Sequence, residues 1–383
     1  MTKPAGCSDN ALFVCPEAIY PAVGGGALRS ASLFEYLAGR YPVDVITFHE
    51  QSVPGAREVL TLALPHHSKS KAARAVRNSR RFVAGRPPLV DRYSGFDSRI
   101  AQWLEGRRYK LAVVEHFWCA PYASVLRPRV DRLVLDLHNI ESRLHATTAA
   151  AAPWPQSAMF RRFAAAYERL ERKWLPWYDD VLVASGADAN RVPAERVAVF
   201  PNTIPRHELP KVPREHAIVF TGNLEYDPNV AAVRWFRNEV WPAIRREEPA
   251  LEWRLVGRNA PAVEPFVRGI DGVRIVGEVA DAVVEIARAK VAVVPLLAGS
   301  GTRFKILEAW AAATPVVSTA IGAEGLGALD YTHLVIANTA GEFADAVVRM
   351  LRSPGQVGCN GRGFYLERYT REAGWRVLAD LGL

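Results

Sequence analysis

The sequence predicts an α/β protein made of two doubly wound domains, each a parallel sheet flanked by helices. Short apolar runs alternate with helical patterns along the chain, which is typical of parallel sheets. A stretch with four prolines in thirteen residues, 201–213, interrupts this alternation and indicates a stiff linker. The 383 residues are also too many for one ordinary core. We expect an N-terminal domain over 1–205 and a second domain over 206–370.

Composition narrows the class of protein. The hydrophobic fraction of 49% and charged fraction of 23% are globular values. No apolar run approaches the ~18 residues that a membrane span needs, and residues 1–10 are polar, so we expect a cytoplasmic protein without a secretory signal. The four cysteines lack a Cys-x-x-Cys spacing, which argues against zinc and disulfides. A net charge of +8 indicates an anionic partner, whether nucleotide sugar, phospholipid or nucleic acid.

The first predicted strand, Ala11–Cys15, is followed by Gly24, Gly25 and Gly26 and then by a helical pattern that ends near Arg40. Ligands of doubly wound domains bind outside the carboxyl ends of the strands. Three consecutive glycines do not match Gly-x-Gly-x-x-Gly, so a dinucleotide is disfavoured. A plain tight turn explains these glycines as well as a ligand loop does.

Residues 68–92 form the most basic segment of the chain, with eight Lys and Arg against the single acid Asp91. A solvated charged helix is the simpler explanation. The alternative is a peripheral contact with an anionic membrane, because clustered basic residues are attracted to such surfaces.

Two further predicted strands, 111–115 and 133–137, are followed by His116 and His138. A histidine just past the end of a central strand projects into the ligand crevice, although a buried structural histidine is the alternative. Predicted strands at 180–185 and 197–200 close this sheet. The chain has no Asp-x-Asp motif, so the sequence predicts no nucleotide-binding metal.

The second half repeats the pattern from residue 217, and its strands end in glycines. Gly222-Asn223, Gly257-Arg258 and Gly277-Glu278-Val279 follow three successive strands, 35 and then 20 residues apart. Glycines at strand ends let a flat base and its phosphates approach the backbone closely.

Residues 291–326 combine an apolar run, the turn Gly299-Ser300-Gly301-Thr302, a helical pattern with Arg303, Lys305 and Glu308, and a second apolar run. The start of a helix offers unpaired N–H groups that suit a phosphate. Arg303 and Lys305 stand where the helix dipole disfavours cations, which indicates an anionic ligand. An ordinary turn with solvated charges is the alternative.

This run closely resembles the signature of retaining glycosyltransferases of the GT-B fold, family 4 type, in which a Gly-x-Gly turn, a Lys and a Glu that opens an "EA" helix precede "PVV". The resemblance covers nearly the whole chain and is strongest over 217–326. It implies two Rossmann-like domains facing a cleft, the first binding the acceptor and the second the donor. It also implies that a terminal helix, 371–383, packs back on the first domain.

The resemblance also implies roles for single residues. Glu308 would bind the ribose hydroxyls, Arg303 and Lys305 the diphosphate, and His138 the donor sugar near its reacting carbon. Arg29 and His116 are candidates on the acceptor side. The expected donor-binding residues are Gly25, Gly26, Gly222, Asn223, Gly257, Arg258, Gly277, Glu278, Val279, Gly299, Ser300, Gly301 and Thr302. The family commonly has a second Glu eight residues before the first, where Ser300 stands here, so a contact to the sugar is lost or moved.

The expected reaction transfers a hexose-like unit, with retention, from a UDP-, GDP- or dTDP-linked sugar to a hydroxyl of a glycan, lipid-linked or small-molecule acceptor. We expect a role in glycan, exopolysaccharide or glycolipid synthesis, with no cofactor, no metal and no nucleic-acid partner. Two alternatives are a GT-B-fold epimerase or hydrolase, which would use Glu115 and Glu141 as acid and base, and an inactive subunit that binds a nucleotide sugar.

Overall fold

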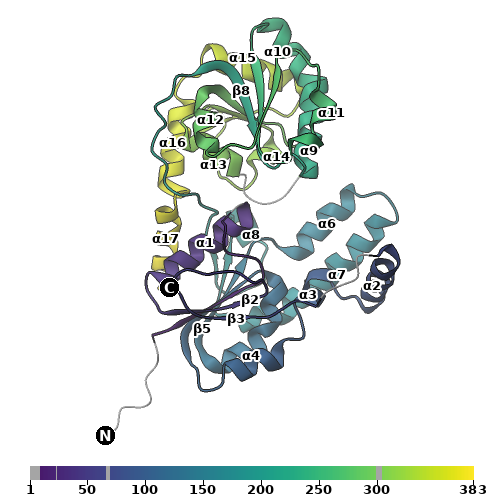
Figure 1. Cartoon of the computed structure of the whole chain (residues 1–383), viewed down its shortest axis with the longest axis vertical. Helices are drawn as coiled ribbons and strands as arrows, with labels where there is room; N and C mark the ends of the chain where they lie inside the picture. The colour runs from purple at the N-terminus through teal and green to yellow at the C-terminus, as the bar shows by residue number, and fades with distance from the viewer. Residues whose placement is uncertain (1–8, 23, 66–69, 299–303) are drawn as a thin grey trace. The chain divides into compact units, whose positions relative to one another are not determined.

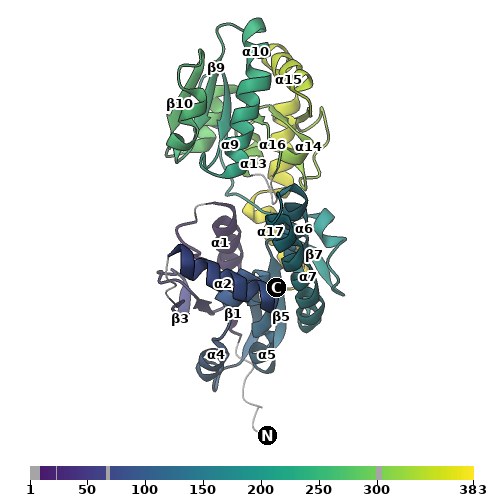
Figure 2. The same cartoon turned by 90° about the vertical axis from the view of Figure 1, so that its right-hand side faces the viewer.

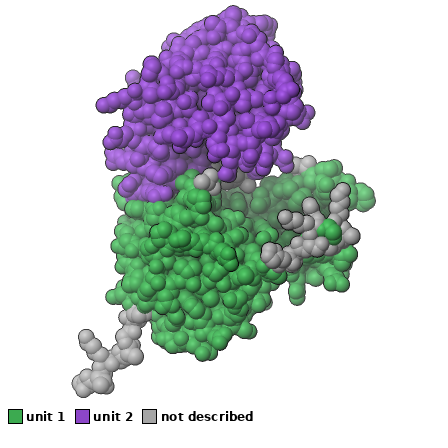
Figure 3. All heavy atoms as spheres, in the orientation of Figure 1, with its two compact units in different colours: residues 1–201, 375–383 green, residues 202–374 purple. Residues whose placement is uncertain are grey.

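The computed structural model describes residues 9–22, 24–65, 70–298 and 304–383. The chain divides into two compact units (Figure 3). Unit 1 comprises residues 1–201 and 375–383, and unit 2 comprises residues 202–374.

Unit 1 is built on a seven-stranded sheet with the order β3-β2-β1-β4-β5-β6-β7, in which every pair is parallel (Figure 1). The strands are β1 (Ala11–Cys15), β2 (Val43–Thr47), β3 (Ala56–Thr61), β4 (Tyr109–Glu115), β5 (Val130–Leu137), β6 (Asp180–Val183) and β7 (Val197–Val199). The sequence reading missed β3, which is an edge strand.

Helices cover both faces of this sheet. They are α1 (Gly25–Ala38), α2 (Lys71–Ala84), α3 (Pro88–Arg92), α4 (Asp97–Trp103), α5 (Ala123–Leu126), α6 (Glu141–Ala151), α7 (Gln156–Trp174) and α8 (Gly186–Ala189), with short 3-10 turns at Phe117–Tyr122, Arg127–Arg129 and Leu175–Trp177. Successive side chains of a strand point to opposite faces. Leu12 and Val14 of β1 therefore join one core, and Phe13 and Cys15 join the other.

Unit 2 contains a six-stranded parallel sheet with the order β10-β9-β8-β11-β12-β13. Its strands are β8 (Glu215–Thr221), β9 (Glu252–Val256), β10 (Val273–Gly277), β11 (Ala289–Val294), β12 (Val316–Ser318) and β13 (Val335–Ile336). Its helices are α9 (Asp227–Trp235), α10 (Trp241–Glu247), α11 (Glu264–Val267), α12 (Ala282–Arg288), α13 (Phe304–Ala311), α14 (Ala320–Ala323), α15 (Ala340–Arg352) and α16 (Val357–Arg368), with a 3-10 turn at Ala260–Ala262.

One helical stretch of unit 2 is interrupted. A π-helical turn at Phe236–Val240 lies between α9 and α10. Pro242 lies in the first turn of α10 and has no N–H to donate, which accounts for the break in the α-helical ladder.

The last helix, α17 (Arg371–Asp380), ends within unit 1. The Trp375 indole N–H donates to the Ser32 carbonyl (2.9 Å), and the Tyr36 hydroxyl donates to the Leu383 carbonyl (2.7 Å). The chain therefore has two parallel-sheet α/β domains, as the sequence predicted. Among the described residues, no helix is both long and apolar enough to cross a membrane.

Candidate functional site

Three glycines join the carboxyl ends of the strands of unit 2. The Gly222 N–H donates to the Val256 carbonyl (3.0 Å), and the Gly257 N–H donates to the Gly277 carbonyl (2.7 Å). A Cβ on Gly257, whose φ is +145°, would lie only 1.8 Å from the Gly222 carbonyl oxygen. No other residue fits there, so the backbones of β8, β9 and β10 form a closely packed edge without side chains.

Lys305, in the first turn of α13, lies against this edge. Its Nζ donates to Asn229 Oδ1 (2.7 Å) and lies 4.3 Å from the centroid of the Phe220 ring. A Cβ on Gly222 would be 3.4 Å from the same Nζ. The ammonium is therefore fixed beside the glycine edge by a hydrogen bond and a cation–π contact.

Asn229 is a site residue that the sequence reading missed. It is buried in the first turn of α9, and its Nδ2 donates to the Asn223 carbonyl (2.7 Å) while its Oδ1 accepts from Lys305. One amide thus joins the end of β8 to α13. The sequence signal was weak, since an Asn at the start of a helix usually indicates a cap.

Glu308 lies one turn beyond Lys305 on α13 and is half-buried. Burial raises the pKa of its carboxyl to about 7; Lys305 opposes the increase, and the charge of Asp281 adds to it. Within the described residues the carboxylate has no hydrogen bond. Near neutral pH this group is present in both its protonated and its ionised form, so it can donate or accept hydrogen bonds.

The remaining predicted donor-binding residues of unit 2 fall into two groups. Gly299, Ser300, Gly301, Thr302 and Arg303 lie outside the described residues. Arg258 and Glu278 are exposed and Val279 is half-buried. The structure therefore brings Lys305 together with Gly222, Gly257 and Gly277, while Asn223 joins them through Asn229.

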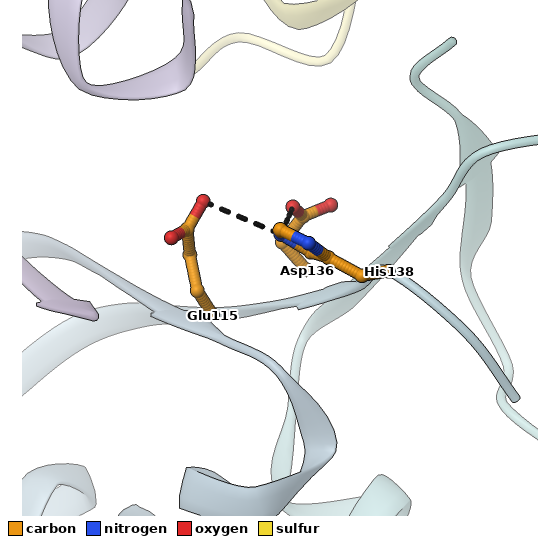
Figure 4. A group of neighbouring side chains, drawn as sticks. All are labelled: Glu115, Asp136 and His138. Carbon is orange, nitrogen blue, oxygen red and sulfur yellow. Dashed lines mark ion pairs between the residues drawn. The ribbon is translucent and has the colours of Figure 1, made fainter. Parts of the chain in front are cut away.

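In unit 1, the ends of β4 and β5 hold a buried cluster of Glu115, Asp136 and His138 (Figure 4). His138 Nε2 lies 3.3 Å from Asp136 Oδ2 and 3.6 Å from Glu115 Oε1. Burial disfavours the charged ring, but the ion pairs with Asp136 and Glu115 outweigh burial and raise the pKa of His138 to about 9. His138 is therefore an imidazolium at neutral pH.

Arg29 was expected to face an acceptor, and the structure places it elsewhere. Its side chain is only 1% exposed and forms a two-pronged pair with Asp136, with Nε to Oδ2 at 2.7 Å. Its Nη1 also donates to the Phe200 carbonyl (2.7 Å). Arg29 therefore holds Asp136 beside His138 through this ion pair. Because its side chain is buried, the expectation that it faces an acceptor is wrong.

Glu115, Asp136 and His138 offer ligand atoms within 4.8 Å of one another, which is the spacing of a metal site. Arg29 already pairs with Asp136, and its neighbouring positive charge disfavours a metal ion at this position.

His116 has a different environment from its neighbour. Its backbone has φ +60°, an uncommon value for a residue with a side chain, and its ring stacks on Trp118 with a centroid distance of 4.2 Å. Burial and the charge of His138 lower the pKa of His116, although Glu17, 3.6 Å from its Nε2, opposes this. His116 is therefore a neutral ring beside a charged one.

The predicted glycine loop adjoins this cluster. A Cβ on Gly26 would lie 3.1 Å from Glu17 Oε2 and 3.7 Å from His138 Nδ1. Gly25 and Gly26 are the first two residues of α1. The helix therefore starts close to His138. Gly26 lies in close contact with both Glu17 and His138, where a larger residue would be crowded.

Comparison with known proteins adds to this geometry. Residues 215–353 match the family model described as "Glycosyl transferases group 1". Sucrose-phosphate synthase from Thermosynechococcus elongatus has a similar structure, with a TM-score of 0.70 and 18% identity over 98% of both chains. The Anabaena protein HepE, solved in complex with UDP and glucose, gives a TM-score of 0.64 and 15% identity over 97% of this chain and 98% of its own.

The chain has the GT-B fold. The two solved structures, at 18% and 15% identity, establish only the fold. The match of residues 215–353 to the family model supports a group 1 glycosyltransferase. A curated relative, an uncharacterised 44.6 kDa protein in the cps region of Klebsiella pneumoniae, is 27% identical over 163 residues. That alignment spans 40% of this chain and 42% of the relative.

Proposed function

We propose that this GT-B protein is a retaining family 4-type glycosyltransferase that moves a hexose-like unit from a nucleotide sugar to an acceptor hydroxyl. The position of Lys305 carries the proposal. Its ammonium is fixed beside the glycine edge of β8, β9 and β10, within the segment that matches the family model. A fixed cation beside bare backbone suits a diphosphate, which needs charge and close approach together.

In the proposed reaction, unit 2 stabilises the leaving group. Lys305, with Arg303 and the turn 299–302, would counter the negative charge that grows on the diphosphate as the glycosidic bond breaks. Glu308 would bind the ribose hydroxyls through a carboxyl whose pKa of about 7 lets it donate as well as accept. These basic groups supply the charge that a metal supplies in other transferases, so we propose a metal-independent reaction.

Unit 1 would hold the sugar and the acceptor. The imidazolium of His138 can donate a hydrogen bond to a sugar hydroxyl, and the loop of Gly25 and Gly26 lies beside it. His116 is proposed to contribute on the acceptor side. We propose a glycan, a lipid-linked or a small-molecule acceptor, in glycan, exopolysaccharide or glycolipid synthesis.

A UDP-linked sugar is the first donor to test, because the similar Anabaena protein is in complex with UDP and glucose. GDP- and dTDP-linked sugars complete the panel. Incubation with each donor and a mixture of acceptors, followed by detection of the free nucleotide and by NMR of the product anomer, tests the proposal. Nucleotide release with a retained anomeric configuration supports it.

Other outcomes of this panel distinguish the competing functions. A free epimer would identify an epimerase; in the structure Glu115 accepts a hydrogen bond from Cys15 Sγ (2.9 Å) and Glu141 accepts one from Trp118 Nε1 (2.9 Å). Tight binding without turnover would identify an inactive binding subunit. If none of the nucleotide sugars raises the melting temperature, the proposal is wrong.

A further inference from the structure

The helix α2 and the turn after it carry an arginine-lined pocket that the proposed transfer reaction does not use. The pocket has a volume of about 530 Å³ and is lined by Val76, Arg77, Arg80, Arg81, Ala84, Arg86 and Asp91. Asp91 is its only acid and is already paired with Arg81, with Nε to Oδ2 at 2.7 Å. Arg77, Arg80 and Arg86 therefore leave the pocket strongly positive.

The outward face of α2 also carries two exposed apolar side chains. Val76 and Val83 are 54% and 75% exposed, and they lie two helical turns apart, so both point in nearly the same direction. Arg80 lies between them on the same face, four residues after Val76 and three before Val83, and Arg77 lies at the side of this face. A free phosphate needs the arginines and gains nothing from two exposed valines. A bilayer surface uses both kinds of side chain, because anionic headgroups and acyl chains meet there.

The inner face of α2 is held by α7. Arg162 Nη2 donates to the Val83 carbonyl (2.8 Å), and its guanidinium lies 5.0 Å from the centroid of the Phe82 ring. In Figure 2, α2 faces the viewer on the surface of unit 1. The turn before α7 carries Trp154, whose side chain is 83% exposed and whose type is common at membrane interfaces.

We propose that the outward face of α2, with its arginine pocket, is a docking surface for an anionic phospholipid membrane. The positive pocket complements the phosphates of the headgroups, and Val76 and Val83 dip into the interface between them. The inference goes beyond the proposed reaction and does not depend on it, because docking needs no nucleotide sugar.

The full chain should co-sediment with vesicles of phosphatidylcholine and phosphatidylglycerol, and not with vesicles of phosphatidylcholine alone. Salt should weaken the binding, since exposed charges are screened. The double variant Arg77→Glu/Arg80→Glu should lose at least about tenfold in partition. Arg99→Glu/Arg246→Glu changes the net charge equally at exposed positions elsewhere and should bind like the unmodified chain.

A second variant separates a membrane from a soluble phosphate. Val76→Ser/Val83→Ser keeps every charge and should still lose severalfold in partition, because the apolar contact is gone. If the serine variant binds vesicles normally while pyrophosphate saturates the arginines, the site takes a soluble phosphate group and the proposal is wrong. Failure of the unmodified chain to bind anionic vesicles, or normal binding by the arginine variant, overturns it as well.

The outcome is independent of the transferase proposal. The melting-temperature shift by UDP should be the same in the unmodified chain and in Arg77→Glu/Arg80→Glu, which also shows that the variant is folded. Loss of membrane binding with an intact UDP shift therefore tests α2 alone. An absent UDP shift in both proteins would instead argue against the nucleotide site.

Discussion

The imidazole rings of His116 and His138 lie with their centroids 3.7 Å apart, and their surroundings give them opposite charge states. Burial lowers the pKa of both rings. Asp136 and Glu115 outweigh burial at His138 and raise its pKa to about 9, whereas Glu17 and Glu115 do not outweigh it at His116. Arg29 holds Asp136 from the other side and keeps its pKa low; burial alone would raise it. The pair therefore presents one cationic and one neutral ring at the strand ends.

The first prediction concerns this charge. Glu115→Gln removes a carboxylate that stabilises the imidazolium, so the pKa of His138 should fall clearly below 9. NMR titration of the ring nitrogens measures it directly. Glu168→Gln, at an exposed position of the same unit, should leave the value unchanged. An unaltered pKa in Glu115→Gln would show that Glu115 does not hold the proton.

The second prediction concerns Glu308 and the stability of unit 2. Its pKa rises from 4.5 to about 7 on folding, so its stabilising effect is complete below 4.5 and is lost as the pH rises through 7. Glu308→Gln resembles the protonated form at every pH. Its melting temperature should match the unmodified chain near pH 4.5 and exceed it by roughly 7–14 °C above pH 7.

Thermal melts over this pH range check the prediction. An equal difference at both ends of the range would mean that the Glu308 carboxyl titrates normally. The same variant should lose donor turnover if the carboxyl binds the ribose, so a more stable but less active protein is the expected combination.

The third prediction concerns Asn229, which holds Lys305 in place. Asn229→Ala should raise the KM for the donor about five- to tenfold with a smaller change in kcat, because the loss of one charge-assisted hydrogen bond leaves the ammonium mobile. Asn360→Ala, at an exposed position on α16, is the control and should be neutral. Steady-state kinetics with unchanged KM in Asn229→Ala would show that Lys305 needs no such support.

The fourth prediction tests the glycine edge. Gly257→Ala places a methyl group against the Gly222 carbonyl at a positive φ, and unit 2 should lose about 3 kcal/mol or fail to fold. Gly363→Ala on α16 has open space around it and should stabilise the helix by about 1 kcal/mol. Denaturant melts of both variants provide the comparison. A Gly257→Ala protein as stable as the unmodified chain would mean that the edge can relax.

Sequence reasoning reached most of the architecture because buried parallel strands leave continuous apolar runs. The predicted strand Ala11–Cys15 coincides with β1, and the two-domain class is confirmed. The edge strand β3 was missed because none of its residues is fully buried, so its sequence lacks the continuous apolar signal. The linker prolines placed the expected boundary at 205, while the compact units divide after 201.

The site was less accessible from the sequence, because its contacts join residues that are far apart along the chain. Arg29 pairs with Asp136, 107 residues away, and Lys305 pairs with Asn229, 76 residues away. The local sequence shows a basic residue after a glycine turn. It does not show which distant carboxylate or amide will accept a hydrogen bond from that residue. The glycine strand ends were predictable because each glycine follows an apolar run, whereas their close packing depends on tertiary structure.

The most direct test of the account is calorimetric titration of UDP into three proteins: the unmodified chain, Lys305→Ala and Lys290→Ala. Lys290 is a half-buried lysine near the opposite end of β11, so its removal controls for a lost positive charge. The account predicts at least about tenfold weaker binding by Lys305→Ala and unchanged binding by Lys290→Ala. Equal affinity of Lys305→Ala and the unmodified chain would contradict the assignment of this edge as the diphosphate site.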